Sequence, residues 1–382
     1  MQIESFQQEF QNIYGRRPQV YRAPGRVNLI GEHTDYNEGF VMPAAINFFT
    51  WLAISRRTDS TINIRSRAFT EPVTIVLNGD LRPRHAWSDY VVGIIDQIRQ
   101  SGKKLAGADI LIQSEVPMGS GLSSSAAIEV AAGFSLLSTN QYAVDRTELA
   151  LLCQRAENLF VGMRCGIMDQ FISCNGTVDH ALMLDCRSLH FRLLPLSPAS
   201  RMVICNTMVK HEHASGEYNK RRNECETGVL ILREFIPEVR ALRDVSAREL
   251  EKYREKLPEV IYRRCHHVVT ENDRVQRAAE ALEQHDMKQF GALMAQSHAS
   301  LRDDYEVSSR ELDLMVEIAN RQPGIFGARM TGGGFGGCTI NLVEASHADR
   351  FRDNVAKQYK KATGLSAEIY ISTAADGANQ VQ

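Results

Sequence analysis

A glycine- and serine-rich segment in the first half of the chain has the composition of a phosphate-binding loop. Residues 117–127 read Pro-Met-Gly-Ser-Gly-Leu-Ser-Ser-Ser-Ala-Ala, and small apolar residues follow through Phe134. Gly119 and Gly121 let the backbone approach a bound anion without a Cβ atom in the way. The run after the serines is predicted to be helical, and the first N–H groups of a helix can bind phosphate. No Gly-Lys-Ser/Thr triplet follows, which excludes a Walker A loop. A solvated turn before a capped helix is the alternative interpretation of this segment alone.

A second cluster, near the N-terminus, is dense in ionisable side chains. Residues 23–37 read Ala-Pro-Gly-Arg-Val-Asn-Leu-Ile-Gly-Glu-His-Thr-Asp-Tyr-Asn, so Arg26, Glu32, His33 and Asp35 fall within ten residues. A buried sugar needs donors and acceptors at fixed positions around its hydroxyl groups, and these side chains can supply them. A polar turn between two strands would explain the glycines, but not this density of ionisable groups.

Two acids in residues 157–170 could act in catalysis or metal binding. Glu157 falls beside the apolar stripe of its predicted helix, and a partly buried carboxylate needs a partner, for which Mg²⁺ is one candidate. Asp169 follows Gly166 and lies between Met168 and Gln170, where it could be a positioned base. Pairing with an arginine, or a capping role, is the alternative for either acid.

A third glycine-rich segment lies near the C-terminus. Residues 329–338 read Arg-Met-Thr-Gly-Gly-Gly-Phe-Gly-Gly-Cys, with five glycines between Gly332 and Gly337. Such a segment leaves few side chains to block a ligand, so its backbone N–H groups can face one. A flexible turn is the alternative, because glycine density alone is a weak signal.

The elements that must position these residues alternate between strand and helix, which indicates a mixed α/β protein. Apolar positions and alternation predict strands and helices in the ranges that follow. The predicted strands are 20–22, 48–56, 61–65, 73–76, 108–114, 338–343 and 367–372. The predicted helices are 88–101 and 347–363, together with one that a capping box at Asp145 and Glu148 opens. Ser246 with Glu249, and Thr270 with Asp273, are further predicted helix starts.

Proline and serine at 195–200 break this pattern and predict a domain boundary there, giving domains at 1–198 and 199–382. A helix-rich, charged region runs from about Thr227 to Asn320. His211-Glu-His213 and Cys265-His-His267 suggest a transition metal, but neither has a known zinc spacing. A solvated loop or a helix face is the expected setting for both.

Bulk composition excludes several classes of function. The chain has 382 residues, 43% hydrophobic and 24% charged, with a net charge of −2. That balance does not favour a nucleic acid or an anionic membrane as the main partner. The first ten residues lack the apolar core of a signal peptide. Eight cysteines occur without a Cys-x-x-Cys pair, as reduced thiols do in a cytoplasmic protein.

Taken in order, the four segments resemble the GHMP superfamily of small-molecule kinases. Within it, Gly-Arg-Val-Asn-Leu-Ile-Gly-Glu-His-Thr-Asp-Tyr resembles the signature of the galactokinases, and Pro-Met-Gly-Ser-Gly-Leu-Ser-Ser-Ser-Ala the superfamily's ATP loop. Gly-Ile-Met-Asp-Gln is similar to the segment that carries the family's catalytic aspartate, and Met-Thr-Gly-Gly-Gly-Phe-Gly-Gly to its third motif. The run Gly-Glu-Tyr-Asn-Lys-Arg-Arg at 216–222 also fits.

This resemblance implies a two-domain α/β (α+β) fold. The first domain is expected to be like domain 2 of ribosomal protein S5, and the second to have a ferredoxin-like core with added helices. It also implies ATP-dependent phosphorylation of α-D-galactose at its 1-hydroxyl, giving galactose 1-phosphate and ADP, the entry step of galactose metabolism. We expect a cytoplasmic monomer whose partners are small molecules, with no nucleic acid and no membrane.

The resemblance also implies residue roles. Asp169 is expected to be the base that takes the sugar hydroxyl proton, with Arg26 beside it. Ser125 and Glu157 are expected to coordinate Mg²⁺. The expected galactose-binding residues are Glu32, His33, Thr34, Asp35, Gly166 and Tyr218. The expected ATP-binding residues are Gly119, Ser120, Gly121, Leu122, Ser123, Ser124 and Ser125.

Two alternatives to this interpretation stay open at the level of sequence. The nearest is a GHMP kinase for another substrate, such as N-acetylgalactosamine or arabinose, since one pocket side chain can decide between sugars. Mevalonate and homoserine fit the Glu-His-Thr-Asp-Tyr run poorly. The other is a sensor that binds sugar and ATP without catalysis, although Ser123–Ala126 and Asp169 are all present.

Overall fold

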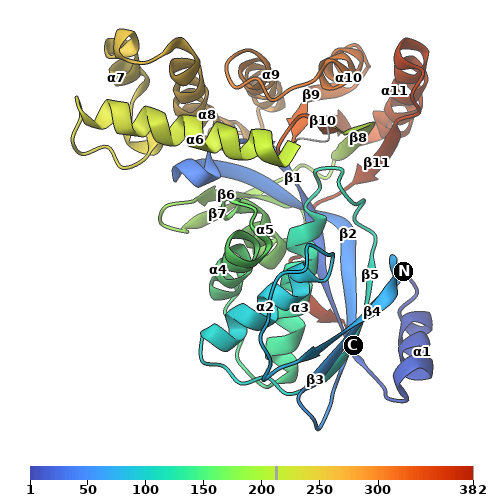
Figure 1. The fold of residues 1–382 in the computed structure, drawn as a ribbon. Coiled ribbons are helices and arrows are strands. Elements are labelled where there is room, and N and C mark those ends of the chain that lie inside the picture. Colours follow the sequence, from blue (N-terminus) through green and yellow to red (C-terminus); the bar gives the residue numbers. More distant parts are fainter. Residues whose placement is uncertain (211–213, 382) are drawn as a thin grey trace.

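Two β-sheets with helices packed on them form the molecule (Figure 1). The structure is a computed structural model that describes residues 1–210 and 214–381. The alternation of strands and helices predicted from the sequence is confirmed.

The first sheet contains the N-terminal strands and is built on two long ones, β1 (Gln19–Ile30) and β2 (Phe40–Arg56). The strand order is β12-β1-β2-β5-β3-β4, and β6 and β7 extend it through a pairing of β6 with β2. Only β3 and β5 pair in parallel among the described strands. The shorter strands are β3 (Thr61–Ser66), β4 (Phe69–Val76), β5 (Ala108–Ser114), β6 (His180–Asp185), β7 (Phe191–Pro195) and β12 (Asn379–Val381).

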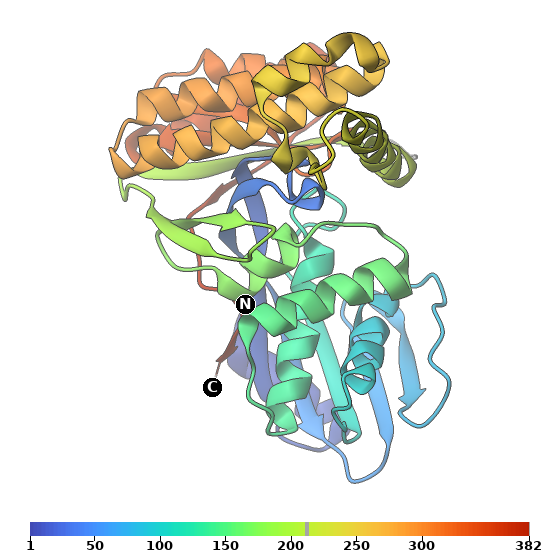
Figure 2. The same cartoon turned by 90° about the vertical axis from the view of Figure 1, so that its left-hand side faces the viewer.

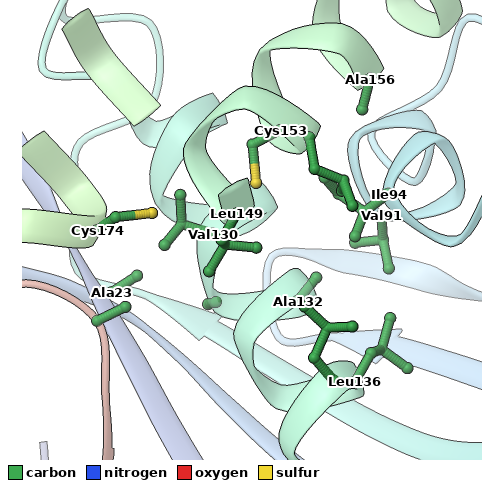
Figure 3. Close-up of a cluster of buried hydrophobic side chains, with 14 of the residues drawn as sticks. Ala23, Val91, Ile94, Val130, Ala132, Leu136, Leu149, Cys153, Ala156 and Cys174 are labelled. Carbon is green, nitrogen blue, oxygen red and sulfur yellow. The ribbon is translucent and has the colours of Figure 1, made fainter. Parts of the chain in front are cut away.

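Four helices cover one face of this sheet, and one covers the other. Apolar side chains from the covering helices and the sheet meet in a buried cluster, part of which is drawn in Figure 3. The four helices are α2 (Asp89–Gln100), α3 (Ser124–Thr139), α4 (Arg146–Ala156) and α5 (Met168–Asn175). On the opposite face, Phe6 and Phe10 of α1 (Ile3–Tyr14) pack with Trp51 and Leu111. The helix α3 has mostly small and apolar residues, which suits its burial between the sheet and its neighbouring helices.

The second sheet has four antiparallel strands in the order β11-β8-β10-β9. In chain order this is 4-1-3-2, the arrangement expected of a ferredoxin-like core. Helices lie over it at the top of the molecule (Figures 1 and 2). The strands are β8 (Ser200–Lys210), β9 (Ile325–Thr331), β10 (Gly336–Glu344) and β11 (Glu368–Ser372). The helices are α6 (Ala214–Arg233), α7 (Ala247–Lys252), α8 (Glu259–Glu283), α9 (Met287–Asp303), α10 (Arg310–Asn320) and α11 (Ala348–Thr363).

Short helical turns complete the chain: η1 (Asp35–Asn37), η2 (Glu157–Val161), η3 (Leu242–Asp244), η4 (Arg254–Lys256) and η5 (Ala345–His347). Of these, η2 is a π-helical turn and directly continues α4. Both η1 and η2 lie at the candidate site described below.

Most of the predicted helices and strands are present, but the strand predicted at 20–22 and the helix start predicted at Thr270 differ from the structure. The predicted caps at Asp145 and Ser246 are confirmed, and α11 ends at Gly364 as predicted. The strand predicted at 20–22 continues through Ile30, because bulges absorb the irregular residues Pro24 and Gly25. The helix start predicted at Thr270 with Asp273 is wrong. Thr270 lies inside α8, and its hydroxyl donates to the His266 carbonyl one turn earlier.

The two sheets share a hydrophobic core rather than standing apart. One buried cluster joins Val27 of β1 and Ala127 of α3 to Ile204 of β8 and Leu293 of α9. The predicted boundary after residue 198 falls between β7 and β8, where the chain passes from one sheet to the other, and it stays a prediction. The chain also passes back, because β12 pairs with β1, and both chain ends lie beside the first sheet (Figure 1). Among the described residues, no helix is both long and apolar enough to cross a membrane.

Candidate active site

A cavity of about 350 Å³ lies between the two halves of the molecule and collects most of the predicted site residues. The predicted residues that line it are Arg26, Glu32, His33, Asp35, Gly119, Gly121, Ser123, Ser124, Ser125, Glu157, Gly166, Asp169 and Tyr218. Its other lining residues are Tyr90, Met163, Cys165, Met168, Gly332 and Gly333. Six separate parts of the sequence therefore meet at one cavity.

Two of the lining residues, Arg26 and Asp169, are joined by two parallel hydrogen bonds. Arg26 Nε donates to Asp169 Oδ1 at 2.8 Å, and Arg26 Nη2 donates to Asp169 Oδ2 at 2.7 Å. Arg26 is only 5% exposed, whereas the Asp169 side chain is 26% exposed toward the cavity. Burial lowers the pKa of Arg26, but Asp169 and Glu32 raise it by more, so the guanidinium stays charged. This pairing keeps a carboxylate available to a ligand while its charge is balanced.

Arg26 reaches this position because β1 is bulged at Gly25. The bulge brings the Arg26 N–H to the Leu122 carbonyl at 3.0 Å, joining β1 to the glycine–serine loop. A Cβ atom on residue 25 would lie 2.7 Å from that carbonyl oxygen, so a glycine is required there. Arg26 Nη1 also donates to the Gly121 carbonyl, and the Ser123 hydroxyl donates to Asp169.

The predicted loop is confirmed as the lead-in to a helix, since α3 begins at Ser124. Gly119, Gly121 and Ser123 have φ values of 64°, 82° and 59°, so the chain turns sharply just before the helix. At this turn, alternate residues face opposite ways. The Ser120 hydroxyl donates to the Pro117 carbonyl at 2.7 Å, and Leu122 is buried in the core. Ser120 and Leu122 therefore do not line the cavity, and their contact with ATP stays a prediction that only their backbone could satisfy.

The third motif packs directly against this loop. A Cβ atom at Gly332 would lie 2.9 Å from the Gly121 carbonyl oxygen, and one at Gly337 would lie 3.0 Å from that of Ser120. Both glycines have positive φ, 85° and 86°. The glycines of the second half thus permit a close approach between the two halves at the cavity wall.

Glu32 and His33 form one wall of the cavity. The Gly332 N–H donates to Glu32 Oε1 at 2.6 Å, and the Arg329 guanidinium lies 3.6 Å from the same oxygen. Burial raises the pKa of Glu32, while Arg329 and Arg26 oppose that shift. His33 Nδ1 lies 2.8 Å from the Tyr36 hydroxyl, and burial lowers the pKa of His33 to about 3. His33 is therefore a neutral hydrogen-bonding group at physiological pH.

Thr34 was expected to bind galactose together with its neighbours, but its side chain faces the protein interior. Its hydroxyl donates to the carbonyls of Gly31 and Phe40, at 2.9 and 2.6 Å, and the residue is fully buried. It does not line the cavity. Its observed contacts hold the turn that presents Glu32, His33 and Asp35.

Asp35 and Gly166 are in direct contact on another wall. A Cβ atom on residue 166 would lie 1.9 Å from Asp35 Oδ2, so only glycine fits there. Burial, with the nearby Asp169 charge second, raises the pKa of Asp35 to about 7. The Tyr218 ring from α6 closes this side, with its centre 5.4 Å from the His33 ring centre.

Glu157 and Ser125, the residues expected to coordinate Mg²⁺, both line the cavity, and their role as ligands stays a prediction. Glu157 is 5% exposed and lines the cavity from η2, and Ser125 lies in the first turn of α3. Burial, with Asp169 second, raises the pKa of Glu157 to about 7, and a hydrogen bond with Ser125 opposes that shift. No group of three or more acidic, histidine or cysteine side chains in the described residues could hold a metal alone. One carboxylate and one hydroxyl nevertheless fit Mg²⁺, which usually keeps waters and takes ligand phosphates.

Cys265-His-His267 does not belong to any group of three or more possible metal ligands among the described residues. His211-Glu-His213 lies outside the described residues. His267 is buried on α8, where its ring nitrogens lie 3.0 Å from Ser300 Oγ and 3.1 Å from the Glu32 carbonyl oxygen. All eight cysteines are free.

Sequence reasoning missed several polar residues at or behind the cavity. Arg329 is a fully buried charge in the middle of β9, and Tyr90 projects into the cavity from α2. Glu129 is fully buried on α3, and burial, with Glu157 second, raises its pKa well above the usual range. Glu129 had a usable signal, because it is the only charged residue between Ser123 and Asn140. Tyr90 had none.

Comparison with known protein families gives matches over most of the chain. Residues 8–56 match the galactokinase galactose-binding signature, residues 89–177 the GHMP kinases N terminal domain, and residues 278–361 the GHMP kinases C terminal domain. Galactokinase from Roseiflexus sp. (strain RS-1) is 47% identical over 98% of this chain and 96% of its own length. Galactokinase from Chloroflexus aurantiacus is 45% identical over 97% of this chain and 96% of its own.

Solved structures agree with these matches. The Lactococcus lactis galactokinase complexed with galactose superimposes with a TM-score of 0.95 at 34% identity, covering 100% of both chains. The mevalonate kinase of Methanococcus jannaschii superimposes with a TM-score of 0.66 at 19% identity, over 94% of this chain and 99% of its own, and is similar in fold alone.

Proposed function

The chain belongs to the galactokinase family of the GHMP kinases, and from this we propose that its cavity transfers the γ-phosphoryl group of ATP to the 1-hydroxyl of α-D-galactose. The products are galactose 1-phosphate and ADP. The observation that carries the proposal is the Arg26–Asp169 pair, which lies between the glycine–serine loop and the Glu32–Asp35 wall.

Galactose occupies the wall of the cavity that Glu32, His33, Asp35 and Tyr218 form. The carboxylates accept hydrogen bonds from sugar hydroxyls, and the neutral His33 offers a further polar group. Gly166 leaves room for Asp35 to stand against the sugar. Thr34 supports this wall from behind through the turn that it holds.

The nucleotide phosphates lie against the loop that ends in Ser123, Ser124 and Ser125. The N-terminus of α3 offers N–H groups and a favourable dipole for negative charge. We assign Ser120 and Leu122 a backbone role in this loop, because their side chains point away from the cavity. Ser125 and Glu157 hold Mg²⁺, which when bound neutralises charge on the phosphates.

Asp169 takes the proton of the galactose 1-hydroxyl as that oxygen forms a bond to the γ-phosphorus and the bond to the ADP oxygen breaks. Arg26 orients Asp169 through its two hydrogen bonds and adds positive charge beside the transferring group. Arg26 also donates to the Gly121 carbonyl, so the same side chain holds both Asp169 and the glycine–serine loop. Positioning and electrostatics supply most of the catalysis in phosphoryl transfer of this kind.

We further propose that the protein works in the cytoplasm as a monomer on small molecules, with no nucleic acid or membrane partner. Eight free cysteines are usual for a reducing compartment. The net charge of −2 gives no electrostatic reason to bind nucleic acid.

Release of ADP by the purified protein with Mg-ATP tests this proposal. The sugars are galactose, N-acetylgalactosamine, glucose and arabinose, with a control lacking sugar. We expect turnover with galactose well above that with the others. Faster turnover with another sugar would overturn the substrate assignment. Galactose binding by calorimetry without turnover on any sugar would instead indicate a sensor.

A further inference from the structure

Glu129 is a buried acid behind the cavity that the reaction described above does not use. It lies on α3 one turn after Ser125, is 0% exposed, and does not line the cavity. Its Oε2 accepts a hydrogen bond from Gln170 Nε2 at 3.1 Å, and its Oε1 has no hydrogen-bond partner among the described residues. Burying a polar group without full hydrogen bonding is unfavourable, so packing alone is a poor reason to have an acid here.

Gln170 connects this acid to the proposed metal ligand. Its Nε2 also donates to Glu157 Oε2, at 2.5 Å, so the two hydrogens of one amide bind two carboxyl groups. Gln170 is 0% exposed and follows Asp169 directly on α5. One side chain therefore ties together α3, η2 and α5, the three elements that carry Ser125, Glu157 and Asp169.

Glu157 needs such support because of where it lies. It opens a π-helical turn, which departs from the regular hydrogen bonding of α4. One of its oxygens, Oε2, is held by Gln170 and lies 3.4 Å from Cys165 Sγ. Groups that orient a metal ligand from behind typically change metal affinity by about 10–100-fold when removed.

We infer that Glu129, acting through Gln170, is a positioning residue that orients the Glu157 carboxylate toward the divalent cation. This inference rests on the proposed function, since it assumes that Glu157 binds the cation. Glu129 itself does not contact cation or substrate. Its task is to hold the Gln170 amide so that both of its hydrogens point at the two acids.

Binding of Mn²⁺ in the presence of ADP, followed by electron paramagnetic resonance of the free ion, tests this inference without catalysis. E129M removes the acceptor at similar volume, and we expect its Mn²⁺ Kd to rise by about tenfold or more. E129Q keeps an oxygen that can accept from Gln170, and we expect a Kd within about threefold of wild type. The matched control is S135A, which removes a buried hydroxyl elsewhere on α3 and leaves the Mn²⁺ Kd unchanged. Galactose affinity, measured by calorimetry, stays near wild type in all three and reports correct folding.

A folded E129M with a Mn²⁺ Kd within threefold of wild type would overturn the inference. If E129M does not bind galactose, Q170M decides, because it breaks the same bridge from the other side, and the same loss of affinity is expected. E157Q distinguishes a failure of the proposed metal site from a failure of the positioning role of Glu129. If E157Q binds Mn²⁺ as tightly as wild type, the proposed metal site is wrong and this inference fails with it. If E157Q binds weakly while E129M and Q170M bind normally, only this inference fails.

Discussion

Asp169 accepts three hydrogen bonds from parts of the chain far from it in sequence. Two come from Arg26 and one from the Ser123 hydroxyl. These donors fix the orientation of the carboxylate. Because the carboxylate is already oriented, it can accept a proton from a bound hydroxyl without rearranging first.

Replacing Asp169 with asparagine tests its role as the base. D169N keeps the size of the side chain but cannot take a proton, so we expect kcat to fall by roughly 10²–10⁴-fold. The galactose Kd, measured by calorimetry, changes little in comparison. A D169N variant with kcat within threefold of wild type would remove Asp169 from the reaction.

The raised pKa of Asp35 predicts a specific pH dependence of stability. Burial and the Asp169 charge raise its folded-state pKa to about 7 from an ordinary value of 3.8. The folded state then binds more protons than the unfolded state between about pH 4 and 7, so this group lowers the free energy of unfolding as pH rises through that window. D35N has no charge to bury. We expect its stability relative to wild type to increase from pH 5 to pH 8.

Urea unfolding of the ligand-free proteins at pH 5, 6, 7 and 8 measures this difference. Other titrating groups are common to both proteins and cancel in the comparison. A difference between D35N and wild type that stays constant over this range would mean that Asp35 is ionised in the folded state throughout.

At the residue scale, the sequence predicted the groups that line the cavity better than the groups behind them. Motif residues such as Arg26 and Asp169 were found, and the cavity collects them. Thr34, Ser120 and Leu122 lie within the same motifs but face away, because side chains in a tight turn alternate in direction. Glu129 and Arg329 were missed because the sequence does not show that they meet Gln170 and Glu32 after folding, although Glu129 stands out as the only charge between Ser123 and Asn140.

At the scale of elements, the site depends on local departures from regular structure. The bulge of β1 at Gly25 brings Arg26 to the loop, and the π-helical turn at η2 carries Glu157 into the cavity. Gly166 lies in the segment between η2 and α5 and touches Asp35 of η1. The contact between Gly166 and Asp35 determines how closely η1 and the segment before α5 approach each other.

Substituting alanine for Gly166 tests that contact. The added Cβ atom would lie 1.9 Å from Asp35 Oδ2, so Asp35 or the backbone must shift. We expect galactose to bind roughly tenfold or more weakly, in line with about 1–3 kcal/mol for overpacking. Calorimetry measures the affinity. The control is G216A on α6, where the added atom meets open space. Equal galactose affinity in G166A and G216A would show that the Asp35–Gly166 contact does not shape the sugar site.

Sequence predicted most elements at this scale because hydrophobic periodicity and caps are local signals. The failures have physical reasons. Pro24 and Gly25 conceal the continuation of β1, because bulges accommodate residues that disfavour strands. Thr270 and Asp273 resemble a capping box inside α8, where tertiary packing of the long helix overrides the local signal. A π-helical turn at Glu157 has no sequence signal of its own.

At the scale of the whole molecule, the two halves are joined by a shared core and by the cavity. The cluster that contains Val27, Ala127, Ile204 and Leu293 spans both sheets, and Arg329 of β9 is buried against Glu32. The chain also returns to the first sheet through β12. A boundary near residue 198 marks where the chain changes sheets, but the shared core predicts that the halves do not unfold separately.

Chemical unfolding followed by two signals tests this prediction. Both tryptophans, Trp51 and Trp87, lie in the first half, whereas the longer helices lie mostly in the second. We expect tryptophan fluorescence and far-ultraviolet circular dichroism to give coincident transitions in urea. A fluorescence transition displaced from the circular dichroism transition would show two independently folding domains.

The measurement that tests the central claim most directly is the identity of the product. The purified protein is incubated with galactose and Mg-ATP, and the reaction is followed by ³¹P and ¹H nuclear magnetic resonance. The proposed function predicts one new phosphate ester, α-galactose 1-phosphate, formed together with ADP. An ester at any other hydroxyl, or ADP formed without a sugar phosphate, would contradict the account.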